Sequence, residues 1–210
     1  MKRIVFTILL LLPVFALLAD ERGEDILRKM ASAFQSYGSY QVEFTATMEG
    51  EFNALPGKLI VSGEKYYLGV YDSEIFFDGR TGYTYSESND EVILETPDPE
   101  DYRLFANPAR IFRLYEQDYS AAFKSNTTLN GKSVAVVEMT PKSTASGYNV
   151  LTVYANPADG TPARMVYRLE EYGKDLILNI VKITPDIPVT PAMFIFDPAK
   201  HPGVEVIDFR

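Results

Sequence analysis

The sequence predicts a mostly β protein, in which one antiparallel sheet follows a helix and is interrupted by a short helical insert. Apolar and polar residues alternate over residues 40–48, a pattern typical of a half-buried strand. Over residues 23–37 the apolar positions instead recur at helical spacing. Turn dipeptides, of which Asn130-Gly131 and Asp159-Gly160 are the clearest, separate the later apolar runs and indicate strands joined by hairpins.

The first element is an amphipathic helix expected over residues 23–37. Lys29 lies on its polar face, and the apolar face carries Ile26, Leu27, Met30, Ala33 and Phe34. Gly38 and Ser39 end the helix, because glycine readily adopts the left-handed turn that closes a helix.

Strands then follow one another as far as residue 95. After the strand over 40–48, Leu55-Pro56-Gly57 is expected to interrupt the pattern. Asp78-Gly79 and Asn89-Asp90 provide turns between neighbouring strands. The further strands are predicted over residues 58–62, 65–71, 74–77, 82–86 and 91–95.

The pattern becomes helical again between Pro97 and Tyr119, where Asn107 caps a helix that starts at Pro108. The rest of the chain returns to strands, in the segments KSVAVVEMTP, YNVLTVYAN, ARMVYRLEEY and LILNIVKIT. The sequence therefore predicts about ten strands in meander order, in a single domain of residues 20–210.

Both faces of the predicted sheet carry bulky apolar groups. Successive strand residues point to opposite faces, yet Tyr66-Tyr67-Leu68 and Ile75-Phe76-Phe77 place such groups at consecutive positions. The apolar groups on both faces must therefore be covered. A strongly curved sheet covers them if its concave face holds a cavity under the helices, while loops pack on parts of the convex face or tyrosine hydroxyls meet water there. A completely filled sandwich or barrel core would cover them equally well.

The N-terminus has the pattern of a signal peptide over residues 1–19. Lys2 and Arg3 precede an apolar run from Ile4 to Leu18, and apolarity stops after Ala19. Since the run is shorter than the ~20 residues of a spanning helix, cleavage after Ala19 is expected, with an uncleaved anchor as the alternative. The mature protein is then exported to the periplasm.

Composition narrows the class of partner. The formal net charge is −9, and it becomes −11 when the signal segment is removed with its two basic residues. Such a surface disfavours nucleic acid and anionic lipid headgroups, so no nucleic-acid partner is expected. The chain contains no cysteine, and therefore neither a disulfide nor the acylated cysteine that anchors a lipoprotein. We expect a freely diffusing monomer.

No catalytic residue, cofactor or metal site is predicted. His201 is the single histidine, and no motif supplies the oriented partner that a triad or a metal site requires. The acidic cluster of Asp98, Glu100 and Asp101 is interpreted as a turn before a helix rather than as an acid–base pair. The sequence also lacks the nucleophile-elbow, P-loop and Rossmann patterns.

Several stretches together resemble the periplasmic outer-membrane lipoprotein carrier family, LolA. The stretch DILRKMASAFQSYGSYQVEFTATM resembles the opening helix and first strand of the family, and GKLIVSGEKYYL its second strand and hairpin. FFDGRTGYTYSESNDEVIL resembles the aspartate-glycine hairpin, FANPARIF the middle lid helices, and MFIFDPAKHPGVEVIDFR the closing segment. The matches occur in the order of the family and span nearly all of the chain after the signal segment.

The resemblance implies an incomplete, strongly curved antiparallel β-barrel covered by a helical lid. It also implies a cavity that takes the acyl chains of lipoproteins from an inner-membrane exporter and passes them to an outer-membrane acceptor. Gly63-Glu64 occupy the positions at which the family has a basic residue, the arginine that latches the lid, followed by proline. Lys65 is the replacement that we consider, although a lysine lacks the planar fork of arginine.

The leading hypothesis is therefore a non-enzymatic carrier of acylated lipoproteins or of another lipid. For each predicted lining residue the alternative is an ordinary core position. Two other functions stay open, a lipid- or lipoprotein-sensing module that reports to a membrane partner and a hydrolase that uses His201. The residues predicted to line the cavity are Met30, Phe34, Phe44, Ala46, Leu59, Val61, Leu104 and Phe112.

Overall fold

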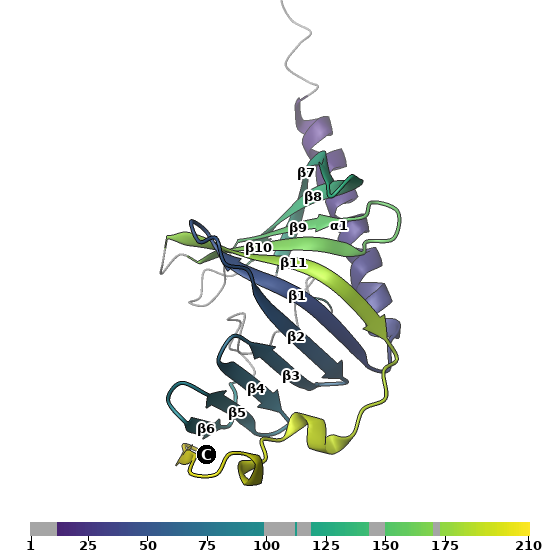
Figure 1. Ribbon diagram of the computed structural model, residues 1–210. Coiled ribbons are helices and arrows are strands. Elements are labelled where there is room, and N and C mark those ends of the chain that lie inside the picture. Colours follow the sequence, from purple (N-terminus) through teal and green to yellow (C-terminus); the bar gives the residue numbers. More distant parts are fainter. Residues whose placement is uncertain (1–11, 99–111, 113–118, 143–149, 170–172) are drawn as a thin grey trace, which may run out of the picture.

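The protein is built on a single twelve-stranded sheet that curls around a concave face, with helix α1 (Leu12–Ser36) beside the strands of one half (Figure 1). The computed structural model describes residues 12–98, 112, 119–142, 150–169 and 173–210, with side chains from residue 21 onward. The predicted mostly β fold with an open, strongly curved antiparallel sheet is confirmed. The predicted middle lid helices lie outside the described residues, apart from Phe112.

Two antiparallel meanders make up the sheet. The first contains β1 (Tyr40–Met48), β2 (Leu55–Ser62), β3 (Lys65–Val70), β4 (Ser73–Phe77), β5 (Gly82–Ser86) and β6 (Glu91–Glu95). The second contains β7 (Tyr119–Leu129), β8 (Lys132–Pro141), β9 (Leu151–Ala155), β10 (Pro162–Leu169) and β11 (Lys174–Pro185). The short strand β12 (Glu205–Asp208) follows near the C-terminus.

The spatial order of the strands is β12-β6-β5-β4-β3-β2-β1-β11-β10-β9-β8-β7. The predicted single meander is wrong, because β1 pairs with β11 and thereby joins the two meanders at the centre of the sheet. In addition, β12 pairs with β6 in the parallel direction. Alternation along a strand shows that a strand forms, but it does not show which distant strand becomes its neighbour.

The expected break at Leu55-Pro56-Gly57 is also wrong, because β2 includes these residues. Gly57 lies opposite Phe44 of β1, and a Cβ atom at Gly57 would lie 2.4 Å from the Phe44 ring. The glycine is therefore part of the strand and leaves room for the ring. Pro56 has no N–H for a ladder, and it lies beyond the residues that β2 pairs with β3.

Helix α1 packs closely on the sheet through its predicted apolar face. Ile26, Leu27, Met30 and Phe34 are buried against residues of the concave face. A glycine permits the contact, because a Cβ atom at Gly160, in the turn between β9 and β10, would lie 2.4 Å from the backbone nitrogen of Met30. The turn and the helix thus touch backbone to backbone.

The same helix extends toward the N-terminus beyond its expected start at residue 23. It begins at Leu12, within the segment predicted to be a signal peptide. Cleavage after Ala19 would leave a helix of residues 20–36, and both the cleavage and the single-domain boundary stay predictions. In the part of the chain that the structure describes, no helix has the length and apolarity that crossing a membrane requires.

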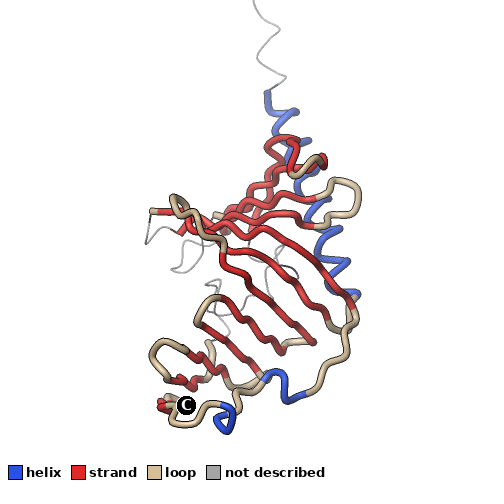
Figure 2. Tube along the Cα trace, in the orientation of Figure 1, coloured by secondary structure: helices blue, strands red, loops and turns tan. Residues whose placement is uncertain are grey.

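The convex face of the first meander is covered by the chain that follows β11. This segment passes through two short 3-10 helices, η2 (Pro191–Phe194) and η3 (Pro198–Lys200), and ends beside β6 (Figure 2). Its buried Phe196 packs on Phe76 of β4 and Tyr85 of β5, with ring centroids 6.0 and 5.1 Å apart. A non-strand segment therefore packs on the convex face, as the two-sided apolar pattern led us to expect.

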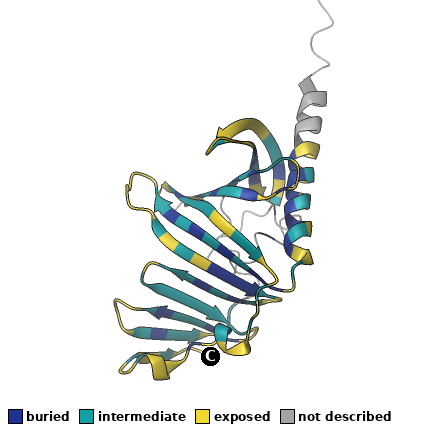
Figure 3. Ribbon diagram, turned by 45° about the vertical axis from the view of Figure 1, so that its right-hand side comes forward, coloured by how far each residue is buried: buried dark blue, intermediate teal, exposed yellow. Residues whose placement is uncertain are grey.

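Buried residues form two separate clusters. The larger one lies between α1 and the concave face, and the smaller one lies between the convex face and the C-terminal segment. In Figure 3, buried and less buried positions alternate along the central strands. Each face of these strands thus has its own apolar contacts.

Candidate functional site

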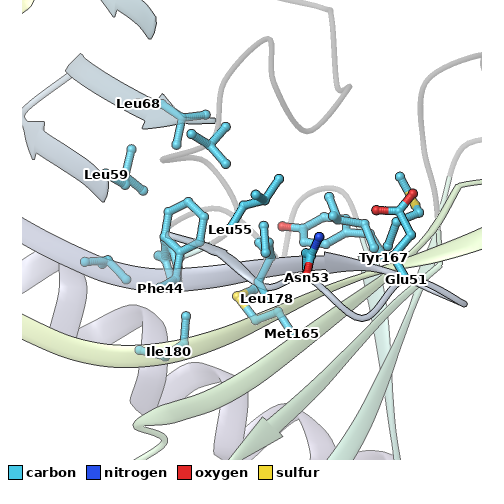
Figure 4. Close-up of a pocket in the computed structure, with 16 residues that line it drawn as sticks. Phe44, Glu51, Asn53, Leu55, Leu59, Leu68, Met165, Tyr167, Leu178 and Ile180 are labelled. Atoms are coloured by element: carbon cyan, nitrogen blue, oxygen red, sulfur yellow. The ribbon is translucent and has the colours of Figure 1, made fainter. Parts of the chain in front are cut away.

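An apolar cavity of about 230 Å³ lies against the concave face of the sheet (Figure 4). Its wall comes from five neighbouring strands, β10, β11, β1, β2 and β3, together with Phe112 and two residues of the β1–β2 loop. The lining residues are Val42, Phe44, Ala46, Met48, Glu51, Asn53, Leu55, Leu59, Leu68, Val70, Phe112, Met165, Tyr167, Leu176, Leu178 and Ile180.

Strand register places these side chains beside one another. Ala46 of β1 lies opposite Leu178 of β11 on one side and Leu55 of β2 on the other. Leu178 in turn lies opposite Met165 of β10. Since directly paired residues share a face of the sheet, one continuous row of apolar side chains crosses four strands.

A β-bulge in β11 contributes to the shape of the wall. The register between β1 and β11 shifts between Glu43 and Phe44, which leaves Val181 of β11 without a partner on β1. The extra residue brings Ile180 and Ile183 to the same face, where both pack on the large cluster. Bulges also bend the strand that carries them, which is consistent with the curl of the sheet at this point.

The cavity has few polar groups. Glu51 and Asn53 are exposed residues of the β1–β2 loop, so this loop forms the rim that faces solvent. No lysine, arginine or histidine of the described chain lines the cavity. Because burial of an ionised group without a partner is very costly, this lining suits an apolar chain rather than an anion.

Tyr167 also belongs to the wall, but its hydroxyl oxygen is buried within the protein. Tyr167 is only 4% exposed, and its hydroxyl has no hydrogen-bond partner among the residues that the structure describes. Burial, with a smaller contribution from Tyr119, raises the pKa of this phenol above its ordinary value. The hydroxyl is therefore a neutral donor at any physiological pH.

Half of the residues predicted from the sequence lie at this cavity, namely Phe44, Ala46, Leu59 and Phe112. Met30, Phe34 and Val61 are fully buried in the large cluster and are not among the lining residues of the cavity. Leu104 lies outside the described residues. A ligand-binding role for the whole set stays a prediction.

Phe34 nevertheless contributes to the wall indirectly. Its ring stacks on that of Phe112 with centroids 4.4 Å apart, and it meets the edge of Tyr40 at 4.9 Å. Helix α1 thus supports Phe112 from behind, and Phe112 in turn faces the cavity.

Lys65, considered as a lid latch, begins β3. The next residue, Tyr66, is buried in the larger cluster on the concave face. Because successive strand residues point to opposite faces, the Lys65 side chain lies on the convex face. Its aliphatic part lies near Gly79 in the β4–β5 turn. The latch role stays a prediction, and in this arrangement Lys65 does not line the cavity.

Sequence reasoning missed the part of the wall that β10 and β11 supply. A signal was present, because Met165 and Tyr167, and likewise Leu176, Leu178 and Ile180, recur at the spacing of one strand face. The information that was lacking is the pairing of β11 with β1.

His201, the alternative catalytic residue, packs against the smaller cluster on the other side of the sheet. Its ring stacks on Phe196 at 4.8 Å and lies 4.4 Å from the ring of Tyr85. Of the acidic cluster, only Asp98 is among the described residues. No group of three or more histidine, aspartate or glutamate residues in the described chain could hold a metal ion.

The sheet and the cavity together define an incomplete β-barrel with an internal apolar cavity on its concave face. Residues 12–156 match the family model of the outer membrane lipoprotein carrier protein LolA. The chain therefore belongs to the LolA family. No curated protein matches the sequence.

The chain is similar to several solved structures at low sequence identity, and the first two of the three that follow share its fold. An uncharacterized conserved protein from Thermus thermophilus has a TM-score of 0.57 and 12% identity, over 88% of this chain and 98% of its own. A DUF1329 family protein from Desulfovibrio piger has a TM-score of 0.50 and 12% identity, over 84% and 97%. A LolA superfamily protein from Nitrosomonas europaea has a TM-score of 0.44 and 13% identity, over 83% and 97%.

Proposed function

We propose that this protein is a periplasmic carrier that shields the acyl chains of lipoproteins, or of another lipid, for transfer toward the outer membrane. The observation that carries the proposal is the cavity, whose buried wall consists of apolar and aromatic side chains. Each buried methylene is worth ~0.8 kcal/mol, so a multiply acylated protein needs such a shield to cross an aqueous compartment. Membership of the LolA family supports a lipoprotein as the cargo.

The proposal assigns different tasks to the predicted residues. Phe44, Ala46, Leu59 and Phe112 contact the acyl chains, and Met30, Phe34 and Val61 hold the wall in place from the core. Leu104 is proposed to close over the ligand. The protein acts as a monomer and without catalysis, takes its cargo from an inner-membrane exporter and delivers it to an outer-membrane acceptor.

Replacement of Phe44 by aspartate tests the proposal. The mature protein is purified from the envelope without detergent, and bound lipid is identified by native mass spectrometry and organic extraction. Wild type should carry an acylated lipid or lipopeptide, and Phe44→Asp should carry none because a carboxylate then lies in the wall. Val181→Asp is the control, since Val181 is 65% exposed and does not line the cavity.

Retention of the ligand by a folded Phe44→Asp protein would contradict the assignment of the cavity. If that variant does not fold, Leu55→Asp replaces it, because Leu55 is a half-buried lining residue. A stable complex with an envelope protein, in place of transient contacts at both membranes, would favour the sensing module. An empty wild-type protein that also ignores an added acylated peptide would make the wall an ordinary core.

A further inference from the structure

We propose that Phe52 and Tyr71, two exposed aromatic residues at the mouth of the cavity, insert into the surface of a zwitterionic phospholipid bilayer, so that the mouth faces the membrane while an acyl chain enters or leaves. This inference rests on the proposed function, since it concerns the step in which the carrier meets its cargo at a membrane. It adds the surface through which the carrier docks and the class of partner that this surface fits.

The first observation is the exposure of Phe52 in the β1–β2 loop. Its side chain is 102% exposed, although the residues before and after it, Glu51 and Asn53, both line the cavity. Isolated exposed apolar residues are common on protein surfaces. Phe52 differs from these because it lies between two residues of the cavity rim and is itself turned to solvent.

The loop that carries Phe52 is held at its base. The backbone nitrogen of Glu49 donates to the carbonyl oxygen of Asp175 at 2.8 Å, and the backbone nitrogen of Asp175 donates to the Glu49 carboxylate at 3.2 Å. The Arg168 guanidinium lies 3.8 Å from the Glu49 carboxylate and 3.1 Å from that of Asp175. The loop is thereby fastened to the start of β11, and its aromatic side chain is exposed at a defined place beside the cavity.

The second observation is the conformation of Tyr71. Tyr71 and Asp72 alone join β3 to β4. Tyr71 has φ +57°, a value that bulky residues rarely adopt and that two-residue hairpin turns usually give to glycine, asparagine or aspartate. Its side chain is 76% exposed, so packing within the protein does not account for a tyrosine here. Strained positions of this kind are typical of functional sites.

Both aromatic residues lie at the same end of the sheet. The β1–β2 loop and the β3–β4 turn leave the sheet at this end (Figure 1), because Gly57, near the start of β2, lies opposite Val70, the last residue of β3. Leu55 and Val70 at this end both line the cavity. Phe52 and Tyr71 each directly follow a lining residue in the chain, so both belong to the mouth of the cavity.

The charges and the layout of the two turns indicate the partner. Residues 49–54 and 71–72 contain Glu49, Glu51 and Asp72 and no basic residue, so anionic lipids repel them whereas zwitterionic head groups do not. Aromatic side chains favour the interface between head groups and acyl chains. A bilayer accepts aromatic residues on separate turns, whereas a stable protein interface needs a continuous surface of about 800 Å² per partner. The two turns therefore fit a zwitterionic bilayer best.

Single tryptophans test the docking surface, because the chain contains no tryptophan of its own. Phe52→Trp and Tyr71→Trp are titrated separately with vesicles of phosphatidylcholine, and with vesicles that contain phosphatidylglycerol in equal amount. The emission of both should move to shorter wavelength on phosphatidylcholine, should be quenched by brominated acyl chains, and should shift less on the anionic vesicles. Phe209→Trp is the matched control and should not shift, since Phe209 is 71% exposed but lies beside Leu94, at the other end of the strands.

A double variant tests the link to transport. Phe52→Ser combined with Tyr71→Asn, in which asparagine tolerates the positive φ, should bind phosphatidylcholine vesicles about tenfold more weakly in a cosedimentation assay. It should also pass bound acylated lipid to vesicles more slowly. Its lipid content by native mass spectrometry should equal that of wild type, because neither residue lines the cavity. Val206→Ser combined with Phe209→Ser removes two other exposed apolar side chains and should change none of these quantities.

The outcomes separate the two proposals. Unshifted emission at either position on phosphatidylcholine, from a protein that carries an acylated lipid, would overturn the docking surface and leave the carrier function standing. Docking by a protein that carries no lipid and binds no acylated peptide would overturn the carrier function and leave the docking surface standing. A shift that requires native envelope membranes and disappears when their proteins are digested would overturn the lipid surface in favour of a protein partner. A larger shift on anionic vesicles would overturn the choice of a zwitterionic surface.

Discussion

Both faces of the sheet carry bulky apolar side chains, and these side chains are covered in different ways. On the convex face the chain covers the aromatic side chains itself, with Phe196 packed on Phe76 and Tyr85. On the concave face α1 covers one part of the wall and a cavity remains beside it. The two faces therefore differ in whether the described chain fills the space beside the sheet or leaves a cavity.

Half-buried Tyr67 and buried Tyr167 show the same difference in their polar atoms. The Tyr67 hydroxyl on the convex face donates to Glu74 Oε1 at 2.5 Å, whereas the Tyr167 hydroxyl on the concave face has no partner in the described chain. Where the chain provides its own cover, it also provides the acceptor.

The largest loss of stability is expected from a substitution at the point where helix α1 packs on the concave face. Gly160 has φ +74°, and a Cβ atom there would lie 2.4 Å from the Met30 nitrogen and 2.6 Å from the Ile26 carbonyl oxygen. Because helix backbone cannot yield as a flexible side chain can, Gly160→Ala should destabilise the protein by roughly 3–5 kcal/mol. Urea unfolding followed by circular dichroism measures the loss.

Gly131→Ala is the matched control for the steric part of that effect. Gly131 has φ +75°, nearly the same as Gly160, but a Cβ atom there would have no neighbour within 4 Å. Only the backbone strain remains, which is about 1–2 kcal/mol. Equal losses in the two variants would show that the helix does not depend on this close contact.

The next largest loss of stability is expected from a substitution on the convex face. Phe196→Ala removes the ring that packs on Phe76, Tyr85 and His201, and truncation of a buried phenylalanine costs about 3 kcal/mol. Affinity for an acyl probe should stay unchanged, because Phe196 does not line the cavity. A loss of probe binding in the folded variant would show that the two faces are coupled.

The same comparison shows what the sequence could predict. Local patterns located β1, β5, β6 and β8 with the bounds that the structure has, because alternation and turn dipeptides are local signals. Asn130 and Gly131, for example, both have positive φ, as a tight hairpin turn requires. The convex cover was harder to predict, since the segment with Phe196 has no periodicity of its own.

The residues that line the cavity were predictable only in part, because only local patterns can be read from the sequence. Phe44 and Ala46 alternate within one strand, and Leu59 follows in the next hairpin, so their shared face can be deduced locally. Tyr167 reaches the cavity because β11 joins β10 to β1. The bulge at Val181 then changes which residues of β11 face inward, and neither feature has a local sequence signal.

Opposite changes in stability are expected for the two tyrosines. Tyr67→Phe deprives the half-buried Glu74 of its donor and should cost about 1 kcal/mol. Tyr167→Phe removes an unsatisfied buried hydroxyl and should stabilise the ligand-free protein by about 1 kcal/mol. Thermal unfolding of ligand-free samples measures both, and a destabilised Tyr167→Phe would indicate that the hydroxyl already has an acceptor within the protein.

The smallest expected effect is a loss of stability at alkaline pH. Burial raises the pKa of Tyr167 above its ordinary value of 10.0, so near that pH the unfolded chain releases this proton while the folded chain keeps it. The unfolded state then binds fewer protons, and stability must fall as the pH rises. Tyr167 should contribute about half a kcal/mol of loss at pH 10 and more above it.

Urea unfolding at pH 9 and pH 10.5 tests this prediction on wild type and Tyr167→Phe. The loss of stability between the two pH values should be smaller in the variant, because it no longer has this phenol. Tyr67, whose pKa is raised by burial and by the hydrogen bond to Glu74, contributes a loss of the same sign in both proteins. Identical losses in the two proteins would show that the Tyr167 hydroxyl is in contact with water rather than buried.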